Sequence, residues 1–453
     1  MAGAGERLAT LRDTERMRGV LAERLRWADG GEVDVRSCAV AYLHDAPNRC
    51  LVHYDLVVRD PRTGTDRPEL VTGFIAGEDR AEQVAKRIGR GAPRPSVGQL
   101  APVAHVPELD LVLQVFPFDQ CLPVLHRLMA GAAPLVAAAI ARDLGPGDWQ
   151  IGGWEAETLR YRVDQRAMVR LTVAALDRSS GASREHRVYA KVFRNSAEGM
   201  RSFEVQRALW NRVGHQGMSF EVARPIAYVA AAQTLLFDEV VGTNLRRVLA
   251  SSPSPSAAIR QTARAVADLH QLSLEEVDFA ARRRPVRDEL ARLEKVGAAV
   301  RADLPAAAAE IDDIVAAVAA KMGGPAIGPT HFDLKPGHIL LDPPRITLLD
   351  FDKMTLADPM VDVANLLVFF HKERSGRPSG GGEHDHVRTF VDEYFAHVPA
   401  PWKAGFPAQY ALALLVEAAT SGRGMRGRGE RSDRATMVSS LLREARLVLD
   451  WHF

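Results

Sequence analysis

The sequence is poor in cysteine and lacks long apolar runs. Its 453 residues include three cysteines, Cys38, Cys50 and Cys121, and none stands in the paired spacing of a metal site. An odd number of cysteines, with no apolar segment of a secretion signal near the start, favours free thiols in the cytoplasm. The longest mildly apolar stretch, residues 129–141, is too short and too rich in alanine to cross a bilayer. We therefore expect a cytoplasmic protein with no membrane partner.

The chain also lacks an excess of either charge. It has 58 Lys and Arg against 57 Asp and Glu, a formal net charge of +1. This balance provides no general attraction to nucleic acid, so we expect no nucleic-acid partner. The motif G-x-x-x-x-G-K-[S/T] is missing too, which excludes a nucleotide-binding loop of that type. With 47% apolar and 25% charged residues, the composition is that of a globular chain of two or three domains.

Two β-rich blocks in the first half resemble each other. Before these blocks, the apolar spacing of residues 5–27 predicts one amphipathic helix. The stretch RCLVHYDLVVRD from Arg49 overlies RAMVRLTVAALD from Arg166 at an offset of 117 residues. Each block reads as a long strand, a polar turn and a second strand. The stretches 112–125 and 235–249 resemble each other at an offset of 123. Residues 37–128 are then a divergent copy of residues 157–249, or both are β-meanders that share only strand alternation.

From about residue 253 the pattern becomes helical, apart from a short pair of strands, HILLD and ITLLD. Strands grouped before helices favour an α+β fold over a doubly wound sheet.

The stretch HFDLKPGH (331–338) carries the chemistry. The Asp333 carboxylate follows a strand and could orient the proton of an attacking hydroxyl, while Lys335 could offset phosphate charge. The two short strands predict a hairpin that delivers Asp350 beside Asp333. A carboxylate at the end of a buried strand suits Mg²⁺, which prefers oxygen ligands.

HFDLKPGH, LLDFD and LADPMVDVANLL, read together, resemble the aminoglycoside phosphotransferase and choline-kinase-like family, which has the protein-kinase-like fold. The resemblance covers about residues 155–453. It implies that Asp333 is the catalytic aspartate and that Asp350 is a principal metal ligand. Two positions depart from the family pattern. His338 replaces a metal-binding asparagine and would bind Mg²⁺ through water, contact a phosphate, or favour Mn²⁺. Asp352 replaces a glycine and would add a metal ligand or, as we favour, face solvent.

The resemblance also implies residues that bind ATP or GTP. Lys191, the only charge in an apolar strand, would hold the phosphates, and Glu204, 13 residues later, would pair with it. The alternative is an edge strand with Lys191 facing water, and Glu198 is the second choice of partner. The turn that covers the phosphates would be residues 163–166, which contain no glycine, with Arg166 adding charge.

The hinge between the two lobes would be LFDEVVG, with Phe237, Asp238, Glu239 and Val240 at the nucleotide base. In the earlier block, Phe74 takes the position of Lys191. That block has no catalytic loop of its own, so it cannot perform transfer alone.

We therefore expect a bilobal protein-kinase-like α+β fold preceded by an extra α+β domain, for which a degenerate copy of the N-lobe is one interpretation. The domains would be an N-terminal helix (1–36), a cap, docking or dimerisation domain (37–150), an N-lobe (151–241) and a helical C-lobe (242–453). The predicted reaction is transfer of the γ-phosphate of ATP or GTP to a hydroxyl of a sugar, aminoglycoside or amino alcohol. The alternatives are transfer to Ser or Thr of a peptide, and an inactive scaffold. A homodimer through the N-terminal domain is a further prediction.

Overall fold

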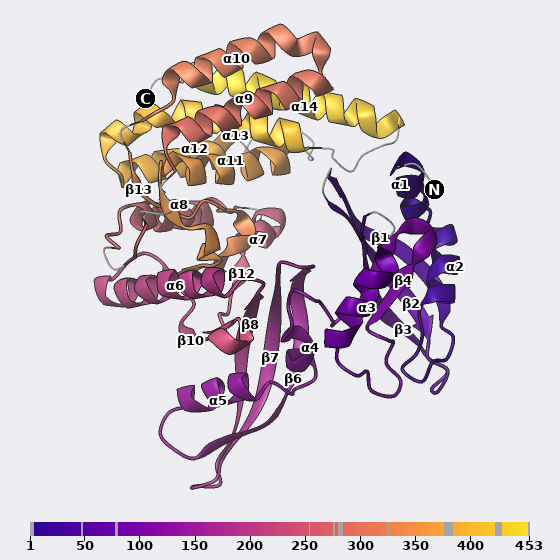
Figure 1. The fold of residues 1–453 in the computed structure, drawn as a ribbon. Helices are drawn as coiled ribbons and strands as arrows, with labels where there is room; N and C mark the ends of the chain where they lie inside the picture. Colours follow the sequence, from indigo (N-terminus) through magenta and orange to yellow (C-terminus); the bar gives the residue numbers. More distant parts are fainter. Residues whose placement is uncertain are drawn as a thin grey trace. The chain divides into compact units, whose positions relative to one another are not determined.

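The computed structural model describes residues 4–46, 49–77, 80–252, 254–274, 277–279, 284–324, 326–375, 384–421 and 428–451. The chain divides into two compact units. Unit 1 contains Met1–Met200 and Ile226–Asp238, and unit 2 contains Arg201–Pro225 and Glu239–Phe453. Each unit is described separately below, with the elements labelled in Figure 1.

Unit 1 begins with two helices, not the single helix expected over residues 5–27. Helix α1 (Ala4–Arg12) ends where Asp13 caps α2 (Thr14–Arg24), because its Oδ1 accepts a hydrogen bond from the backbone N–H of Arg16 at 3.0 Å. The break turns the apolar faces of both helices toward one sheet, along which they run in Figure 1.

This first sheet has five strands in the order β1-β2-β3-β5-β4. The elements that form it and its connecting helix are β1 (Asp34–Ala46), β2 (Arg49–Arg59), β3 (Asp66–Ile75), α3 (Ala81–Gly91), β4 (Val103–Val106), the short helix η1 (Pro107–Leu109) and β5 (Leu111–Val115). Alternate side chains of β2, from Val52 to Val58, are buried against Leu11, Met17 and Leu21 of the two helices. One face of the sheet is thereby covered.

The second sheet repeats this plan, with strand order β6-β7-β8-β11-β10. Its elements are α4 (Leu125–Met129), α5 (Pro134–Asp143), β6 (Trp149–Arg162), β7 (Arg166–Asp177), β8 (Ser183–Phe193), β10 (Pro225–Val229), the short helix η2 (Ala230–Ala232) and β11 (Thr234–Asp238). Val169 and Leu171 of β7 pack with Leu128 of α4 and Ile140 of α5. A helical pair therefore covers the same face of this sheet as α1 and α2 cover in the first.

The pairing registers of the two sheets match at the offsets found in the sequence. Phe74 of β3 pairs with Val112 of β5, and Lys191 of β8 pairs with Leu235 of β11, which lie 117 and 123 residues further on. The turns match as well, because Gly64 donates its N–H to the Asp60 carbonyl and Gly181 donates to the Asp177 carbonyl, both within unit 1.

β-Meanders that shared only strand alternation would not be expected to agree in strand order, register and turn at once. We infer that the chain contains two copies of one structure. The first repeat is α1 to β5, and the second repeat is α4, α5, β6–β8, β10 and β11.

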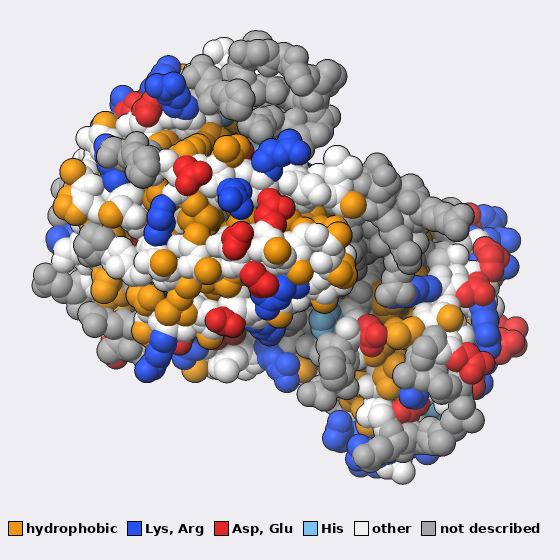
Figure 2. All heavy atoms as spheres, turned by 90° about the horizontal axis from the view of Figure 1, so that it is seen from above, with side chains coloured by type: hydrophobic (Ala, Val, Ile, Leu, Met, Phe, Trp, Pro, Cys, Tyr) orange, Lys and Arg blue, Asp and Glu red, His pale blue; other side chains and the backbone are white. Residues whose placement is uncertain are grey.

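Unit 2 holds most of the helices. These are α6 (Ser196–Gln216, whose first five residues belong to unit 1), α7 (Leu245–Ser251), α8 (Ser256–His270), α9 (Val286–Asp303), α10 (Ala308–Lys321), α11 (Met360–Ser375), α12 (His384–Ala396), α13 (Phe406–Thr420) and α14 (Arg428–Leu449), with short 3-10 turns η4 (Pro305–Ala307) and η7 (Ala400–Gly405). In Figure 1 α13 lies among α9, α10 and α14, and its side chains are buried on nearly every side. On the face in Figure 2 the described acidic and basic side chains are interspersed.

The remaining strands of unit 2 are short and frame the expected catalytic segment. A sheet of order β12-β14-β15-β9 is built from β9 (Glu221–Val222), β12 (Thr243–Asn244), β14 (Ile339–Asp342) and β15 (Arg345–Leu348). A second pair joins β13 (Gly328–Thr330) to β16 (Thr355–Ala357). Between them lie the turns η5 (Pro336–His338) and η6 (Phe351–Lys353). In the described part of the chain, no helix is both long enough and apolar enough to cross a membrane.

Candidate active site

The segment 331–335 leaves β13 and is held by a buried carboxylate below it. Asp362, at the start of α11, accepts hydrogen bonds from the backbone N–H of His331 at 2.6 Å and of Phe332 at 2.8 Å. Phe332 has φ 64°, a left-handed conformation that is costly for a residue with a large side chain. The two hydrogen bonds to a fully buried carboxylate offset that cost and fix the direction in which Asp333 leaves the loop.

Asp362 is itself oriented from the other side. His270 of α8 lies 3.2 Å from its Oδ2 through Nε2, and the other ring nitrogen of His270 lies 2.8 Å from the Tyr394 hydroxyl of α12. All three side chains are buried. The second aspartate of D-P-x-x-D is thus part of a hydrogen-bonded support for the catalytic loop, and His270 has the structural role that its place on a core helix suggests.

The predicted hairpin is confirmed and brings the acidic residues together. Strands β14 and β15 pair antiparallel from Ile339↔Leu348 to Asp342↔Arg345, and the chain then turns at Asp350 with φ 67°. One ligand atom from each of Asp333, His338 and Asp350 lies within 4.8 Å of the others. Two carboxylates and an imidazole at this separation could hold one divalent cation.

Asp333 lies between two lysines. Lys335 Nζ is 3.1 Å from one carboxylate oxygen and Lys353 Nζ is 3.0 Å from the other. Burial alone would raise the pKa of Asp333, but the hydrogen bond and charge of Lys353, joined by Lys335, outweigh it and hold the pKa below its ordinary value. The carboxylate is therefore ionised at neutral pH. Lys335 was expected from the sequence, whereas Lys353 was not, because its only signal is its place directly after D-F-D.

His338 is neutral at physiological pH. Burial lowers its pKa to about 3, against the opposing charge of Asp350. Its Nε2 lies 3.4 Å from Asp350 Oδ2, while its Nδ1 is buried and has no hydrogen-bond partner among the described residues. A neutral imidazole can donate a lone pair to a cation, so the ring suits metal binding better than an imidazolium would.

Asp352 does not join this cluster. It is buried, so the expectation that it faces solvent is wrong. Its Oδ1 accepts a hydrogen bond from the Ser202 hydroxyl of α6 at 2.6 Å, and it is not among the three residues grouped as possible ligands. At the position of the family glycine, Asp352 therefore ties the end of the hairpin to α6 within unit 2.

Lys191 lies on a central strand of the second sheet. It is 5% exposed, its ammonium lies 5.6 Å from the centre of the Phe193 ring, and β8 is flanked by β7 and β11. An edge strand with Lys191 facing water is therefore excluded. A buried ammonium is costly unless a partner or ligand offsets its charge, which keeps Lys191 a candidate for phosphate binding.

Glu204, the expected partner of Lys191, differs in burial from Glu198, the second choice. Helix α6 buries Ser202, Gln206 and Leu209 on one face. Glu198 precedes Ser202 by one helical turn, lies on the same face and is half-buried, whereas Glu204 is exposed. Glu204 also lies in unit 2 and Lys191 in unit 1, so their pairing stays a prediction.

The turn expected to cover the phosphates is held by internal hydrogen bonds. Asp164 has φ 56° and donates its backbone N–H to Asp119 Oδ2 at 2.7 Å, and Gln165 donates to the Arg162 carbonyl at 3.0 Å. These two N–H groups are engaged within the protein, so the backbone of this turn has fewer donors for a phosphate than we expected. Arg166 is half-buried at the first position of β7, and its role stays a prediction.

The expected hinge residues fall at a boundary. Unit 1 ends at Asp238, the last residue of β11, and unit 2 resumes at Glu239. Asp238 lies 3.7 Å from the His186 ring of β8, and Phe237, Glu239 and Val240 are half-buried. The residues therefore lie at the boundary between the two units, and their roles as a hinge and in base recognition stay predictions.

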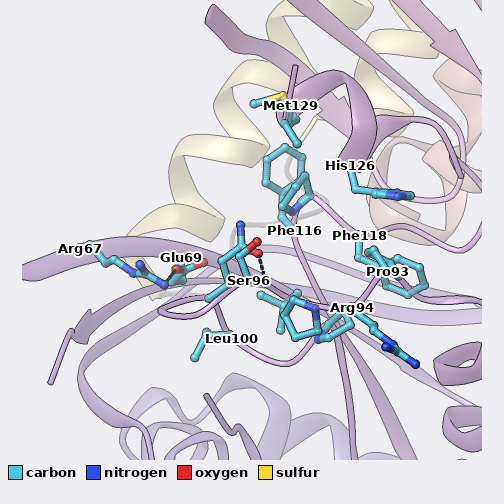
Figure 3. A pocket seen from close by; sticks show the side chains of 16 residues that line it. Arg67, Glu69, Pro93, Arg94, Ser96, Leu100, Phe116, Phe118, His126 and Met129 are labelled. Atoms are coloured by element: carbon cyan, nitrogen blue, oxygen red, sulfur yellow. Dashed lines mark hydrogen bonds and ion pairs between the residues drawn. The ribbon is translucent and has the colours of Figure 1, made fainter. Parts of the chain in front are cut away.

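Unit 1 also contains a cavity of about 400 Å³ away from Lys191. Figure 3 shows Phe116 beside Met129 of α4, with Arg67 and Glu69 of β3 at one end and Arg94 at the other. Arg67 Nη2 lies 2.8 Å from Glu69 Oε1, so the buried charge of Glu69 is paired. The cavity was not expected from the sequence.

An ionised carboxylate between two lysines, next to a second carboxylate at the end of a hairpin, forms a site suited to phosphoryl transfer. The sequence model of the phosphotransferase enzyme family matches residues 148–394, more than half of the chain. The chain belongs to this family, and the expected phosphotransferase class and α+β fold are confirmed. No curated protein sequence matches the chain.

Several solved structures are similar to parts of the chain. One is a putative aminoglycoside phosphotransferase from Ralstonia eutropha, with 13% identity over 70% of this chain and 97% of that chain, and a TM-score of 0.46. Another is a choline/ethanolamine kinase family protein from Mesorhizobium loti, with 14% identity, coverage of 72% and 96%, and a TM-score of 0.40. A third is a macrolide 2'-phosphotransferase from Brachybacterium faecium, with 17% identity, coverage of 62% and 91%, and a TM-score of 0.40. At these TM-scores the family assignment rests on the sequence match.

Proposed function

We propose that this protein transfers the γ-phosphate of ATP, or of GTP, to a hydroxyl group of a small molecule such as a sugar, aminoglycoside or amino alcohol. The observation that carries the proposal is the grouping of Asp333, His338 and Asp350 beside Lys335 and Lys353. Such a cluster supplies a carboxylate for the acceptor, a place for a cation and positive charge for the phosphate.

In the proposed step, the acceptor oxygen attacks the γ-phosphorus and forms a new P–O bond. The bond from that phosphorus to the β–γ bridging oxygen breaks, and the nucleoside diphosphate leaves with the electron pair. Asp333 orients the hydroxyl and takes up its proton, which later passes to water. Lys335 and Lys353 hold Asp333 in place and reduce the negative charge around the transferred group, while Lys191 of unit 1 holds the other phosphates.

A divalent cation, when bound, would offset the negative charge of the phosphates. Asp350 and His338 are the residues that we propose to hold it, Asp350 as a carboxylate ligand and His338 as a neutral imidazole. The two groups differ in preference, because Mg²⁺ favours oxygen whereas imidazole suits softer divalent ions. We therefore propose Mg²⁺ with Mn²⁺ as an effective substitute.

Two alternatives remain open to test. The protein could phosphorylate Ser or Thr of a peptide, with the first repeat as a docking domain or a dimer contact. It could also be an inactive scaffold, which the altered ligand His338 and the turn without glycine favour. The retained Asp333, Asp350 and buried Lys191 support the enzyme over the scaffold. The three free cysteines support a reducing compartment such as the cytoplasm.

The test is transfer of labelled γ-phosphate from ATP and GTP to a panel of sugars, aminoglycosides, amino alcohols and peptides, with Mg²⁺ or Mn²⁺. We expect transfer to at least one small hydroxyl acceptor and a fall of about 10²–10⁴-fold in kcat for Asp333→Asn, which loses the carboxylate that handles the proton. The matched control is Asp342→Asn on the same hairpin, where the carboxylate contacts Arg345, and it should keep wild-type activity. Nucleotide binding without transfer under every condition would instead support a scaffold.

A further inference from the structure

The first repeat uses the sheet face that carries Lys191 in the second repeat to hold the tip of a hairpin. His53 of β2 pairs with Thr72 of β3, and Phe74 follows on the same face at the position equivalent to Lys191. The Tyr161 ring, near the end of β6, lies 6.1 Å from the His53 ring and 5.1 Å from the Phe116 ring, measured between centroids. On this face α3 therefore packs with Phe74, and the β6–β7 hairpin contacts His53 beside it.

Asp119 is the polar centre of this contact. Its side chain is 1% exposed and lies just after the first repeat. Oδ2 accepts hydrogen bonds from the Tyr161 hydroxyl at 2.9 Å and from the Asp164 N–H at 2.7 Å, and Oδ1 accepts one from the Cys121 N–H at 2.8 Å. A buried carboxylate with three donors is strongly localised, because moving it would leave those donors without a partner.

The hydrogen bond to Asp164 determines the shape of the turn at residues 163–166. Asp164 adopts φ 56°, which glycine, asparagine and aspartate tolerate best. In this family the corresponding turn is rich in glycine, whose freedom lets the backbone approach phosphates. Here the left-handed conformation is provided by aspartate and held from outside the hairpin by Asp119. At the offset of 123, Gly242 follows the second repeat as Asp119 follows the first, so the second repeat has no counterpart of this carboxylate.

We propose that Asp119 is a positioning residue for the nucleotide, through which the first repeat fixes the turn that precedes Arg166. The inference rests on the proposed function, since it takes this turn as the one that covers the phosphates. The first repeat then supports the nucleotide site. The hydrogen bond from Asp164 to Asp119 fixes the conformation that glycine would adopt freely. Arg166, the first residue of β7, is the side chain that the fixed turn presents.

The test compares ADP binding by the full-length wild type and Asp119→Ala, by calorimetry with Mg²⁺ or Mn²⁺. Without the carboxylate the turn samples other conformations, so we expect ADP to bind about tenfold more weakly. Hydrogen exchange of the Asp164 amide should become faster in the same variant. Tyr161→Phe, which keeps the carboxylate bond to the turn, should lose much less affinity.

The matched control is Asp177→Ala. Asp177 is also a buried carboxylate that holds a turn of the second repeat, but its turn lies between β7 and β8, at the other end of β7 from residues 163–166. Asp177→Ala should lower thermal stability and leave ADP affinity unchanged. This result would separate a positioning effect of Asp119 from a general loss of structure. If wild type binds ADP and Asp119→Ala binds it equally well, the inference is wrong while the proposed function stands. If wild type binds no nucleotide, both are wrong.

Discussion

The two repeats of unit 1 have the same strand order and pairing, but the side chains on one face of the sheet differ in charge. In the second repeat this face carries Lys191 on β8. In the first it carries Phe74 at the equivalent place, and Tyr161 from the other repeat packs two residues further along the sheet. In both repeats a helical pair covers one face of a β-meander. This shared architecture does not determine what the opposite face of the sheet binds.

Two copies of one structure can thus differ in whether a charged side chain on this face suits a phosphate ligand. A phenylalanine in place of the lysine carries no charge for a phosphate to neutralise. The apolar surface that remains can then pack against a protein segment. In this chain α3 of the first repeat packs with Phe74, and Tyr161 of the second repeat contacts the neighbouring His53.

The largest change in activity should come from giving the second repeat the side chain that the first repeat has at the position of Lys191. Lys191→Phe removes the ammonium proposed to hold the phosphates, so we expect kcat/KM for ATP to fall about 100-fold or more. The measurement is steady-state phosphate transfer to the acceptor found in the panel. Phe74→Leu, at the equivalent place in the first repeat, is the control and should keep full activity. Equal losses in both variants would mean that the two faces do not differ in function.

The repeat was visible in the sequence because its evidence is local. Alternating apolar residues indicate the strands, and each offset holds along the stretches that it relates. The strand registers observed are therefore the ones that the overlay of the two blocks implied. The catalytic hairpin was predictable for the same reason, since a short connection fixes which residues face each other. One helix over residues 5–27 was wrong because apolar spacing continues across Asp13, whose capping hydrogen bond interrupts the helix.

Contacts between distant segments were not predictable. Lys353 reaches Asp333 across 20 residues, and Asp119 reaches Asp164 across 45, and no periodicity marks either contact. Glu204 was chosen by its distance along the chain from Lys191. The buried face of α6 instead favours Glu198, a distinction that depends on which side of the helix packs.

An intermediate effect is expected from that choice of partner. If Glu198 supports Lys191, then Glu198→Gln should lower kcat/KM for ATP about tenfold, the loss expected when one charge-assisted hydrogen bond worth ~1.5 kcal/mol is removed. Glu204→Gln, on the exposed face of the same helix, is the matched control. The same kinetic assay measures both. The opposite order of effects would restore Glu204 as the partner and show that burial on α6 is a poor guide to the nucleotide site.

The smallest effect should lie outside the repeats, in the catalytic segment that the chain contains once. His338→Asn restores the oxygen ligand that the family pattern has at this position, so we expect the ratio of activity with Mg²⁺ to activity with Mn²⁺ to rise severalfold. Total activity with the better metal should change little, because Asp333 and Asp350 are intact. Metal titrations of transfer activity measure the ratio, and Asp342→Asn again provides the control. If the ratio does not move, His338 is not a metal ligand, and its buried ring would then serve to pack beneath the His331 ring, whose centroid lies 5.7 Å away.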